Sequence, residues 1–318
     1  MLDPISQSAV RLISNFLPNR SIDSVELLSG GLINTNVKVS FLNHKPVVVR
    51  LHRDGSKSCR KELAIHHLAH VTVPLAKIIH SEPDGLEDLP PFSILEFVSG
   101  ITFQQLKRTE NVPAINQAAY SVGETLARIG QFRFSNPGEL LVKDGSLKVG
   151  SRFIDGPNPI PHLLDGFLSA PVCQQRLNSK LVDLVHNFGW AHCDLVPSLD
   201  ENPRLVHCDF GNRNIIVHET GKGWQVAAVL DWELSISGSQ LLDVGHFLRY
   251  EQFDQPLREP YFSRGFIENG GDLPSNWKQI VRVIDLTGLV ECLTHESLPT
   301  EVTSELITLI EATISMQV

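Results

Sequence analysis

The sequence predicts a bilobal α+β fold, with an antiparallel five-stranded sheet and one helix in the N-terminal lobe and a mainly helical C-terminal lobe. Short β-rich runs bounded by turn residues fill most of the first hundred positions. Helical spacing of apolar residues dominates after Gly100. The chain has 318 residues, 42% of them hydrophobic, which is enough for two lobes.

The N-terminal half begins with an amphipathic helix, predicted over residues 5–17 and ended by Pro18. A second helix, predicted over residues 58–69, interrupts the strands. The predicted strands cover residues 24–31, 35–41, 46–51, 77–80 and 92–98. We expect the lobe boundary near Gly100, which gives an N-terminal lobe over 1–99 and a C-terminal lobe over 100–318.

The C-terminal half combines helices with one hairpin. A stretch rich in Gly, Pro and Asn, residues 136–165, is expected to be a long irregular insertion. Apolar runs on either side of a Gly-Lys-Gly turn predict the hairpin over residues 206–230. The predicted helices cover residues 114–129, 172–187, 277–293 and 304–314.

The net charge is −9, and the segment 241–318 carries twelve acidic and five basic residues. A protein that binds duplex nucleic acid usually has the opposite balance, so no nucleic-acid partner is expected. The acidic residues could line a pocket for a cationic substrate, although a solvated helix surface explains the charge counts more simply.

The five cysteines are odd in number and scattered, which favours reduced thiols in the cytoplasm over a disulfide framework. The first residues lack the basic and apolar segments of a signal peptide. No apolar run approaches the length needed to span a membrane. The sequence therefore predicts a soluble cytoplasmic protein with no membrane partner.

The segment His207-Cys-Asp-Phe-Gly-Asn-Arg-Asn214 carries the strongest chemical signal. It places Asp209 five residues before Asn214, on a loop between two apolar strands, and Asp231 ends the next strand. Phosphoryl transfer uses one carboxylate to orient the acceptor hydroxyl, and a second carboxylate with an amide oxygen to hold Mg²⁺. Each residue alone is explained as a turn or cap residue, but the combination in this order favours phosphoryl transfer.

The segment 207–233 resembles the signature of the aminoglycoside-phosphotransferase and choline-kinase-like families, which are related to protein kinases. The resemblance implies a protein-kinase-like fold, with Asp209 as the catalytic base and with Asn214 and Asp231 as Mg²⁺ ligands. It also implies that His207 holds the loop and that Asp243 braces it by hydrogen bonding. The expected activity is transfer of the γ-phosphoryl group of ATP, with GTP as the alternative nucleotide, to a hydroxyl of a small aminoglycoside-like or other amino/hydroxy metabolite.

The N-terminal half contains residues that suit the binding of such a nucleotide. Glycine lets a backbone approach phosphate closely, so Gly30 and Gly31 are expected over the phosphates. The resemblance implies that Arg50 contacts the phosphates and pairs with a helix Glu, for which Glu62 is the best candidate. The expected adenine contacts are the backbone groups of Glu96 and Val98, in the segment that resembles the linker between lobes. The simpler alternatives are a hairpin turn, a surface salt bridge and a buried strand.

Two features depart from the family pattern. Gly211 stands where the family often has His or a basic residue, although Arg213 could supply the charge. A second His-Cys-Asp at 192–194 has Leu199 where the metal-binding Asn would stand, so it is interpreted as structural or incidental.

Other kinds of site are weaker alternatives. Zinc is not expected, because adjacent His-Cys pairs are poor tetrahedral chelators. A protein kinase is disfavoured, since no Asp-Phe-Gly occurs at Asp231. A nucleotide-binding pseudokinase with a regulatory or scaffold role remains an alternative, and Gly211 favours it. Acidity and chain order make Glu233, Glu251 and Asp254 candidates for binding a cationic acceptor.

Overall fold

The computed structural model describes residues 3–28, 34–86, 88–152, 158–195 and 202–315. The chain divides into two compact units, and each is built from segments that are not contiguous in sequence. The first unit comprises Met1–Thr109, Leu140–Lys148 and Arg213–Leu234, and the second comprises Glu110–Glu139, Val149–Asn212 and Ser235–Val318. The boundary predicted near Gly100 stays a prediction.

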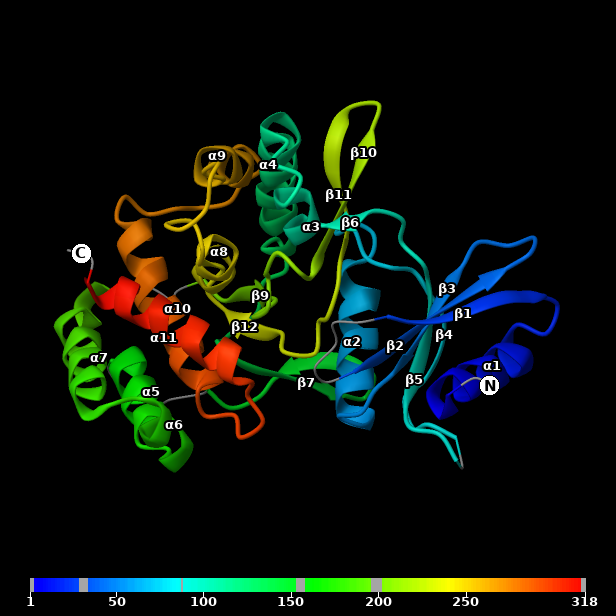
Figure 1. Ribbon diagram of the computed structural model, residues 1–318, viewed down its shortest axis with the longest axis horizontal. Coiled ribbons are helices and arrows are strands. Elements are labelled where there is room, and N and C mark those ends of the chain that lie inside the picture. Colours follow the sequence, from blue (N-terminus) through cyan, green and yellow to red (C-terminus); the bar gives the residue numbers. More distant parts are fainter. Residues whose placement is uncertain (1–2, 29–33, 87, 153–157, 196–201, 316–318) are drawn as a thin grey trace. The chain divides into compact units, whose positions relative to one another are not determined.

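The first unit contains the predicted antiparallel five-stranded sheet, in the order β1-β2-β3-β5-β4. Its strands are β1 (Ile22–Leu28), β2 (Thr35–Phe41), β3 (Val47–Leu51), β4 (Ile78–Glu82) and β5 (Phe92–Glu96). Helix α1 (Pro4–Phe16) packs on this sheet, and Leu12 and Ile13 share a fully buried core with Val37 and Val39 of β2 (Figure 1). Alternate residues of β2 are buried because successive strand side chains point to opposite faces.

A second group of elements in the first unit surrounds the predicted hairpin. It contains α2 (Ser56–Ala69), β6 (Ile101–Thr102), α3 (Phe103–Lys107), β10 (Ile215–Thr220) and β11 (Gly223–Val229). Strand β10 pairs with both β11 and β6. Just before β6, Gly100 has a φ of +149°, and a Cβ there would lie 2.5 Å from the Val217 carbonyl oxygen. Glycine is therefore needed where β6 approaches the hairpin.

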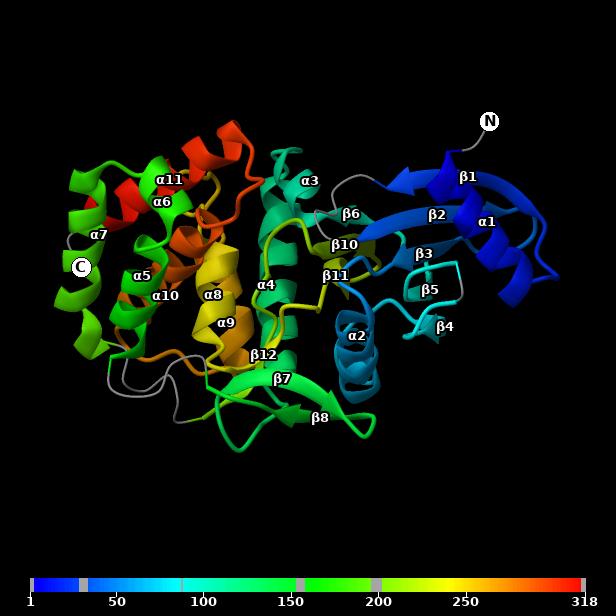
Figure 2. The same cartoon turned by 90° about the horizontal axis from the view of Figure 1, so that it is seen from below.

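The second unit is mainly helical, as predicted. Its helices are α4 (Val112–Ile129), α5 (Pro159–Leu168), α6 (Pro171–Arg176), α7 (Ser179–Ala191), the 3₁₀ turn η1 (Cys193–Leu195), α8 (Leu241–Leu248), α9 (Glu259–Glu268), α10 (Trp277–Cys292) and α11 (Thr300–Ser315). Helix α10 contacts α5, α8 and α11, and α7 contacts α5 and α11 (Figure 2). The single helix expected over 172–187 is two helices, because Asn178 caps α7 by accepting a hydrogen bond from the Leu181 N–H.

The prediction of an irregular insertion over 136–165 is wrong. Strands β7 (Gly138–Lys143) and β8 (Ser146–Val149) form a hairpin there, and α5 begins within the same stretch. Asp144 and Gly145 make the turn with φ of 51° and 71°. Positive φ at both central residues is what a tight hairpin turn requires, and Asp-Gly supplies it readily. The Gly, Pro and Asn content that suggested irregularity therefore marks the ends of regular elements.

Two short strands complete the second unit. Strands β9 (Arg204–Val206) and β12 (Ile236–Gly238) pair with each other, and β12 also pairs with Gly138 and Glu139 at the start of β7. In the part of the chain that the structure describes, no helix is both long and apolar enough to cross a membrane. All five cysteines lie in that part, and none of them forms a disulfide.

Candidate active site

Strand β9 leads directly into the predicted catalytic loop, and Asp243 of α8 holds the start of that loop. The Asp243 carboxylate accepts backbone N–H bonds from His207, at 2.8 Å, and from Cys208, at 2.9 Å. Its side chain is fully buried, and this burial raises the pKa of Asp243 to about 7, against the effect of the two hydrogen bonds. The bracing role expected for Asp243 is confirmed.

The loop presents Asp209 at the surface of the second unit. Cys208 has a φ of 65°, so the chain turns sharply just before Asp209. The Asp209 N–H donates to Nδ1 of His207 at 3.2 Å, and His207 is fully buried, which agrees with its predicted structural role. The Asp209 side chain is 42% exposed, and its Oδ1 lies 3.4 Å from Nε2 of His246. An accessible carboxylate on a loop held by these hydrogen bonds is well suited to orient a substrate hydroxyl.

In the first unit, the β10–β11 hairpin holds the two predicted metal ligands at its open end. Ile215 pairs with Val229, and the N–H of Leu230 donates to the Asn214 carbonyl at 2.8 Å. Asp231 follows with a φ of 65°, which turns its side chain out of the strand direction. The hairpin therefore brings the backbone of Asn214 next to Leu230, which directly precedes Asp231. The order of the strands predicts this proximity.

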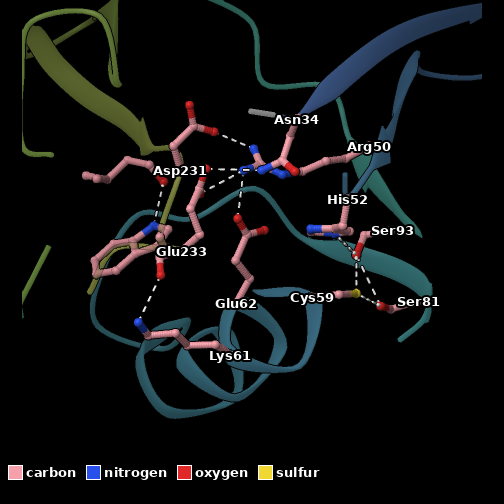
Figure 3. A network of polar contacts seen from close by, with 12 residues as sticks. Asn34, Arg50, His52, Cys59, Lys61, Glu62, Ser81, Ser93, Asp231 and Glu233 are labelled. Carbon is pink, nitrogen blue, oxygen red and sulfur yellow. Dashed lines mark hydrogen bonds and ion pairs between the residues drawn. The ribbon is translucent and has the colours of Figure 1, made fainter. Parts of the chain in front are cut away.

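Arg50 of β3 contacts three carboxylates of the first unit (Figure 3). Its Nη2 lies 2.7 Å from Oε1 of Glu62 and 2.9 Å from Oε2 of Glu233. Its Nη1 pairs with Oδ1 of Asp231. The predicted pairing of Arg50 with Glu62 is confirmed, whereas the contacts with Asp231 and Glu233 are new.

The charges of this cluster do not balance within the four side chains. Burial raises the pKa of the Glu62 carboxyl well above its usual range, and Arg50 opposes that shift. Lys61 donates to the backbone carbonyl of Glu233 at 2.9 Å and adds one positive charge nearby. One guanidinium therefore serves three carboxylates, and burial favours the neutral form of one of them, Glu62.

The residues at the hairpin end fit a magnesium ion. The Asp231 side chain is 28% exposed, so part of it stays accessible beside Arg50. A carboxylate and an amide oxygen are hard donors of the kind that Mg²⁺ prefers, and Mg²⁺ commonly completes its shell with water and substrate phosphates. Among the residues that the structure describes, no group of three or more His, Cys, Asp or Glu side chains is placed to hold a metal. Asn214 and Asp231 therefore supply donors of the kind that Mg²⁺ prefers, and their role as metal ligands stays a prediction.

The other residues predicted to bind the nucleotide are placed less fully. Gly30 and Gly31 lie outside the described residues. Asn34, which follows them, is buried, and its Nδ2 donates to Oε1 of Glu233 at 3.1 Å. Glu96 ends β5, and its N–H donates to the Lys77 carbonyl at 2.8 Å. Val98 follows as a half-buried residue. The adenine contacts of Glu96 and Val98 stay predictions.

The candidate acidic residues for a cationic acceptor already have internal partners. Glu251 and Asp254 both pair with Arg258, at 2.8 and 3.1 Å, and Arg258 is fully buried. Glu233 is held by Arg50, as described above. Arg258 also donates to Oδ1 of Asn212 in the catalytic loop, at 3.3 Å. Glu251 and Asp254 therefore neutralise the buried Arg258 beside the loop, a role that nothing in the linear sequence signals.

The second His-Cys-Asp lies in a different setting from the catalytic loop. Cys193 and Asp194 form a 3₁₀ turn at the end of α7, and Asp194 is exposed. No strand leads into this turn, in contrast to β9 before His207. The two copies of His-Cys-Asp therefore differ in local structure, since one lies in a 3₁₀ turn after a helix and the other in a loop after a strand.

Comparison with known proteins assigns this architecture to a family. Residues 24–275 match the phosphotransferase enzyme family. Acyl-CoA dehydrogenase family member 11 of Pongo abelii is 38% identical over 199 residues, which cover 58% of this chain and 22% of that protein. The probable acyl-CoA dehydrogenase IBR3 of Arabidopsis thaliana is 25% identical over 205 residues, which cover 63% of this chain and 23% of that protein. The match spans less than a quarter of either relative.

Solved structures share the fold at low sequence identity. Aminoglycoside phosphotransferase APH(4)-Ia, in a ternary complex with AMP-PNP and hygromycin B, has a TM-score of 0.67 at 17% identity and covers 96% of this chain and 97% of its own. A putative fructosamine-3-kinase from Thermobifida fusca has a TM-score of 0.63 at 13% identity, over 99% and 100% of the two chains. These similarities show a protein-kinase-like fold, and with the match over residues 24–275 the chain belongs to the phosphotransferase enzyme family.

Proposed function

We propose that this protein transfers the γ-phosphoryl group of ATP, with GTP as the alternative nucleotide, to a hydroxyl group of a small molecule. The observation that carries the proposal is the position of Arg50, which contacts both Glu62 and Asp231. This contact supports the proposal because it puts a cation suited to bind phosphates beside a carboxylate suited to bind a metal ion, within one unit. The brace from Asp243 to the loop of Asp209 is the second support.

Each residue has a defined part in the proposed reaction. Asp209 orients the acceptor hydroxyl and takes its proton, while the hydroxyl oxygen forms a bond to the γ-phosphorus. The bond from the γ-phosphorus to the bridging oxygen breaks, and the nucleoside diphosphate leaves with that electron pair. Arg50, positioned by Glu62, holds the phosphates. Asn214 and Asp231 would hold Mg²⁺, which neutralises charge on the phosphates when it is bound.

The nucleotide and the acceptor are proposed from the kinds of protein that share the fold. APH(4)-Ia has been solved with AMP-PNP and hygromycin B, and the aminoglycoside 2″-phosphotransferase IIIa with GDP and kanamycin. The curated relatives are named as acyl-CoA dehydrogenases. Because a phosphoryl acceptor needs a hydroxyl, we propose a panel of aminoglycosides, amino and hydroxy metabolites, fructosamines and hydroxylated acyl-CoA thioesters.

The test is a mass-spectrometric screen of this panel for a gained phosphoryl group, with ATP and GTP in parallel and Mg²⁺ present. We expect at least one phosphorylated product with wild type and none with Asp231→Asn. This substitution removes the negative charge of one of the two proposed metal ligands. Nucleotide binding without any product, together with equal background ATP turnover in wild type and Asp209→Ala, would contradict the proposal. That outcome would favour the pseudokinase alternative, which Gly211 supports.

The cellular location is a separate proposal. We propose a reducing, cytoplasmic compartment, supported by five cysteines of which none forms a disulfide. Free-thiol counting on the protein purified from its own cells, alkylated before lysis, should find five reduced thiols. A stable disulfide in that sample would contradict the location.

A further inference from the structure

His246 of α8 lies directly against the catalytic loop, beside the glycine that departs from the family pattern. Its Nε2 is 3.4 Å from Oδ1 of Asp209, and its side chain is only 21% exposed. A Cβ built on Gly211 would lie 3.6 Å from Cδ2 and 3.7 Å from Nε2 of the same ring. A larger side chain at position 211 would compete with the His246 ring for this space. The family often has a basic residue at position 211, and here an imidazole from another element occupies the adjoining space.

The His246 ring has two hydrogen-bond acceptors beside it, whereas a neutral imidazole has only one N–H to donate. The backbone of Cys208 acts on the ring in the direction that raises its pKa, as a hydrogen-bond acceptor does. The Asp209 carboxylate is also an acceptor. A neutral imidazole has one N–H, whereas the protonated ring has two. The protonated ring is thus the state that satisfies both neighbours.

The surroundings keep the resting ring neutral. Burial lowers the pKa of His246 well below its usual range, and the charges of Arg249 and His207 act in the same direction. Arg249 is itself paired with Asp285 of α10, at 2.7 Å. Among the described residues, Asp243 on the loop side and Cys292 of α10 also lie near Asp209. Nε2 of His246 nevertheless lies 3.4 Å from Oδ1 of Asp209, close enough for a proton to pass between the two side chains.

We infer that His246 is a positioning residue that acts through Asp209, as the group to which Asp209 passes the proton it takes from the acceptor hydroxyl. The inference rests on the proposed function. The hydroxyl proton moves to an Asp209 oxygen as the bond to the γ-phosphorus forms, and then to Nε2 of His246. Asp209 is left ionised beside an imidazolium, and the nucleoside diphosphate leaves as before. After product release the proton returns to solvent, and the ring is neutral again.

The first test examines the interaction of Asp209 with His246 by a measurement that does not depend on enzymatic activity. Histidine ring nitrogens are followed by NMR in ¹⁵N-histidine-labelled protein, with His246 assigned from His246→Asn. We expect Asp209→Asn to lower the pKa of His246 further, because it removes a negative charge 3.4 Å away. The matched control, Asp194→Asn in the exposed second His-Cys-Asp, should leave it unchanged. An unchanged His246 titration in Asp209→Asn would overturn the inference whatever the protein phosphorylates.

The second test distinguishes two roles for His246, as a proton acceptor or as a side chain that only fills space. The probe is background hydrolysis of Mg-ATP, with water as the acceptor, measured as release of inorganic phosphate. His246→Ala should lower kcat by roughly tenfold to a hundredfold with little change in the KM for ATP. His246→Asn keeps a donor N–H but cannot take up a proton, so we expect it to be as slow as His246→Ala. The control His218→Ala removes an exposed histidine of β10 and should match wild type.

The double variant Asp209→Ala/His246→Ala decides whether the two residues act as one unit. Residues that act together give non-additive losses, so we expect this variant to be no slower than Asp209→Ala. Wild-type kcat in His246→Asn, or a full multiplicative loss in the double variant, would overturn the relay. Absence of any phosphorylated product in the screen, together with absence of phosphate release by wild type, would overturn the proposed function and the relay with it. The NMR titration would still report on the pair itself, so the two failures are distinguishable.

Discussion

The guanidinium of Arg50 contacts the carboxylate of Asp231, which lies 181 residues further along the chain. The contact joins β3 of the five-stranded sheet to the end of the β10–β11 hairpin, within the first unit. It also makes one buried cation the shared partner of three carboxylates. Stability and the proposed phosphate chemistry therefore depend on the same side chain.

Arg50→Ala should destabilise the protein by about 3–5 kcal/mol, because it leaves buried carboxylates without their cation. Urea unfolding followed by circular dichroism measures the loss. The matched control is Arg60→Ala, whose partner Asp84 is 75% exposed and whose own side chain is 45% exposed. An exposed pair contributes less than about 1 kcal/mol. Equal losses in the two variants would contradict the central role given to Arg50.

Glycine at position 123 allows α4 and α9 to approach closely. A Cβ on Gly123 would lie 2.0 Å from the Phe262 carbonyl oxygen and 2.7 Å from the Phe266 nitrogen, so the two helices would have to move apart. We expect Gly123→Ala to destabilise the protein by about 1–3 kcal/mol. Gly166→Ala in α5, where nothing lies within 4 Å of the new Cβ, should instead stabilise it by about 0.5–1 kcal/mol. Urea unfolding of both variants distinguishes the signs, and a stabilising Gly123→Ala would contradict the packing.

The pKa of Asp243 predicts a specific pH dependence of stability. Burial raises this pKa from 3.8 to about 7 in the folded protein. The folded state thus holds the proton more tightly, and the resulting stabilisation, complete below pH 3.8, is lost as the pH rises to about 7. Asp243→Asn has no such proton, so wild type should lose stability relative to the variant across this window. Urea unfolding of both proteins at several pH values measures the difference, and a difference independent of pH would refute the shift.

The sequence predicts the parts of the site that lie on neighbouring elements or in one motif. Arg50 and Glu62 sit on a consecutive strand and helix, so their pairing follows from the order of the elements. Asp243 is placed by its motif, and the structure bears out its hydrogen bonds to the loop. The five-stranded sheet follows from the β-rich runs and the turn residues that bound them, and β2 also shows the alternating burial of a strand with one buried face.

The rest depends on contacts between distant segments, for which one sequence carries no signal. From the sequence, Glu233 is a candidate for binding a cationic acceptor. In the structure it accepts a hydrogen bond from Arg50, which lies 183 positions before it in the chain. His246 lies in an apolar helix, and only the fold brings it to Asp209. Asp144-Gly145 is a local signal for the β7–β8 hairpin, but the high Gly, Pro and Asn content of residues 136–165 is also typical of an irregular segment.

Asp209 is the residue on which the proposed phosphoryl transfer most depends, and the second His-Cys-Asp provides its control. Phosphorylation of the acceptor found in the screen should be measured for wild type, Asp209→Ala and Asp194→Ala at saturating Mg-ATP. We predict that Asp209→Ala loses roughly a hundredfold or more in kcat while Asp194→Ala, altered at an exposed turn, matches wild type. Equal rates in Asp209→Ala and wild type would contradict the account.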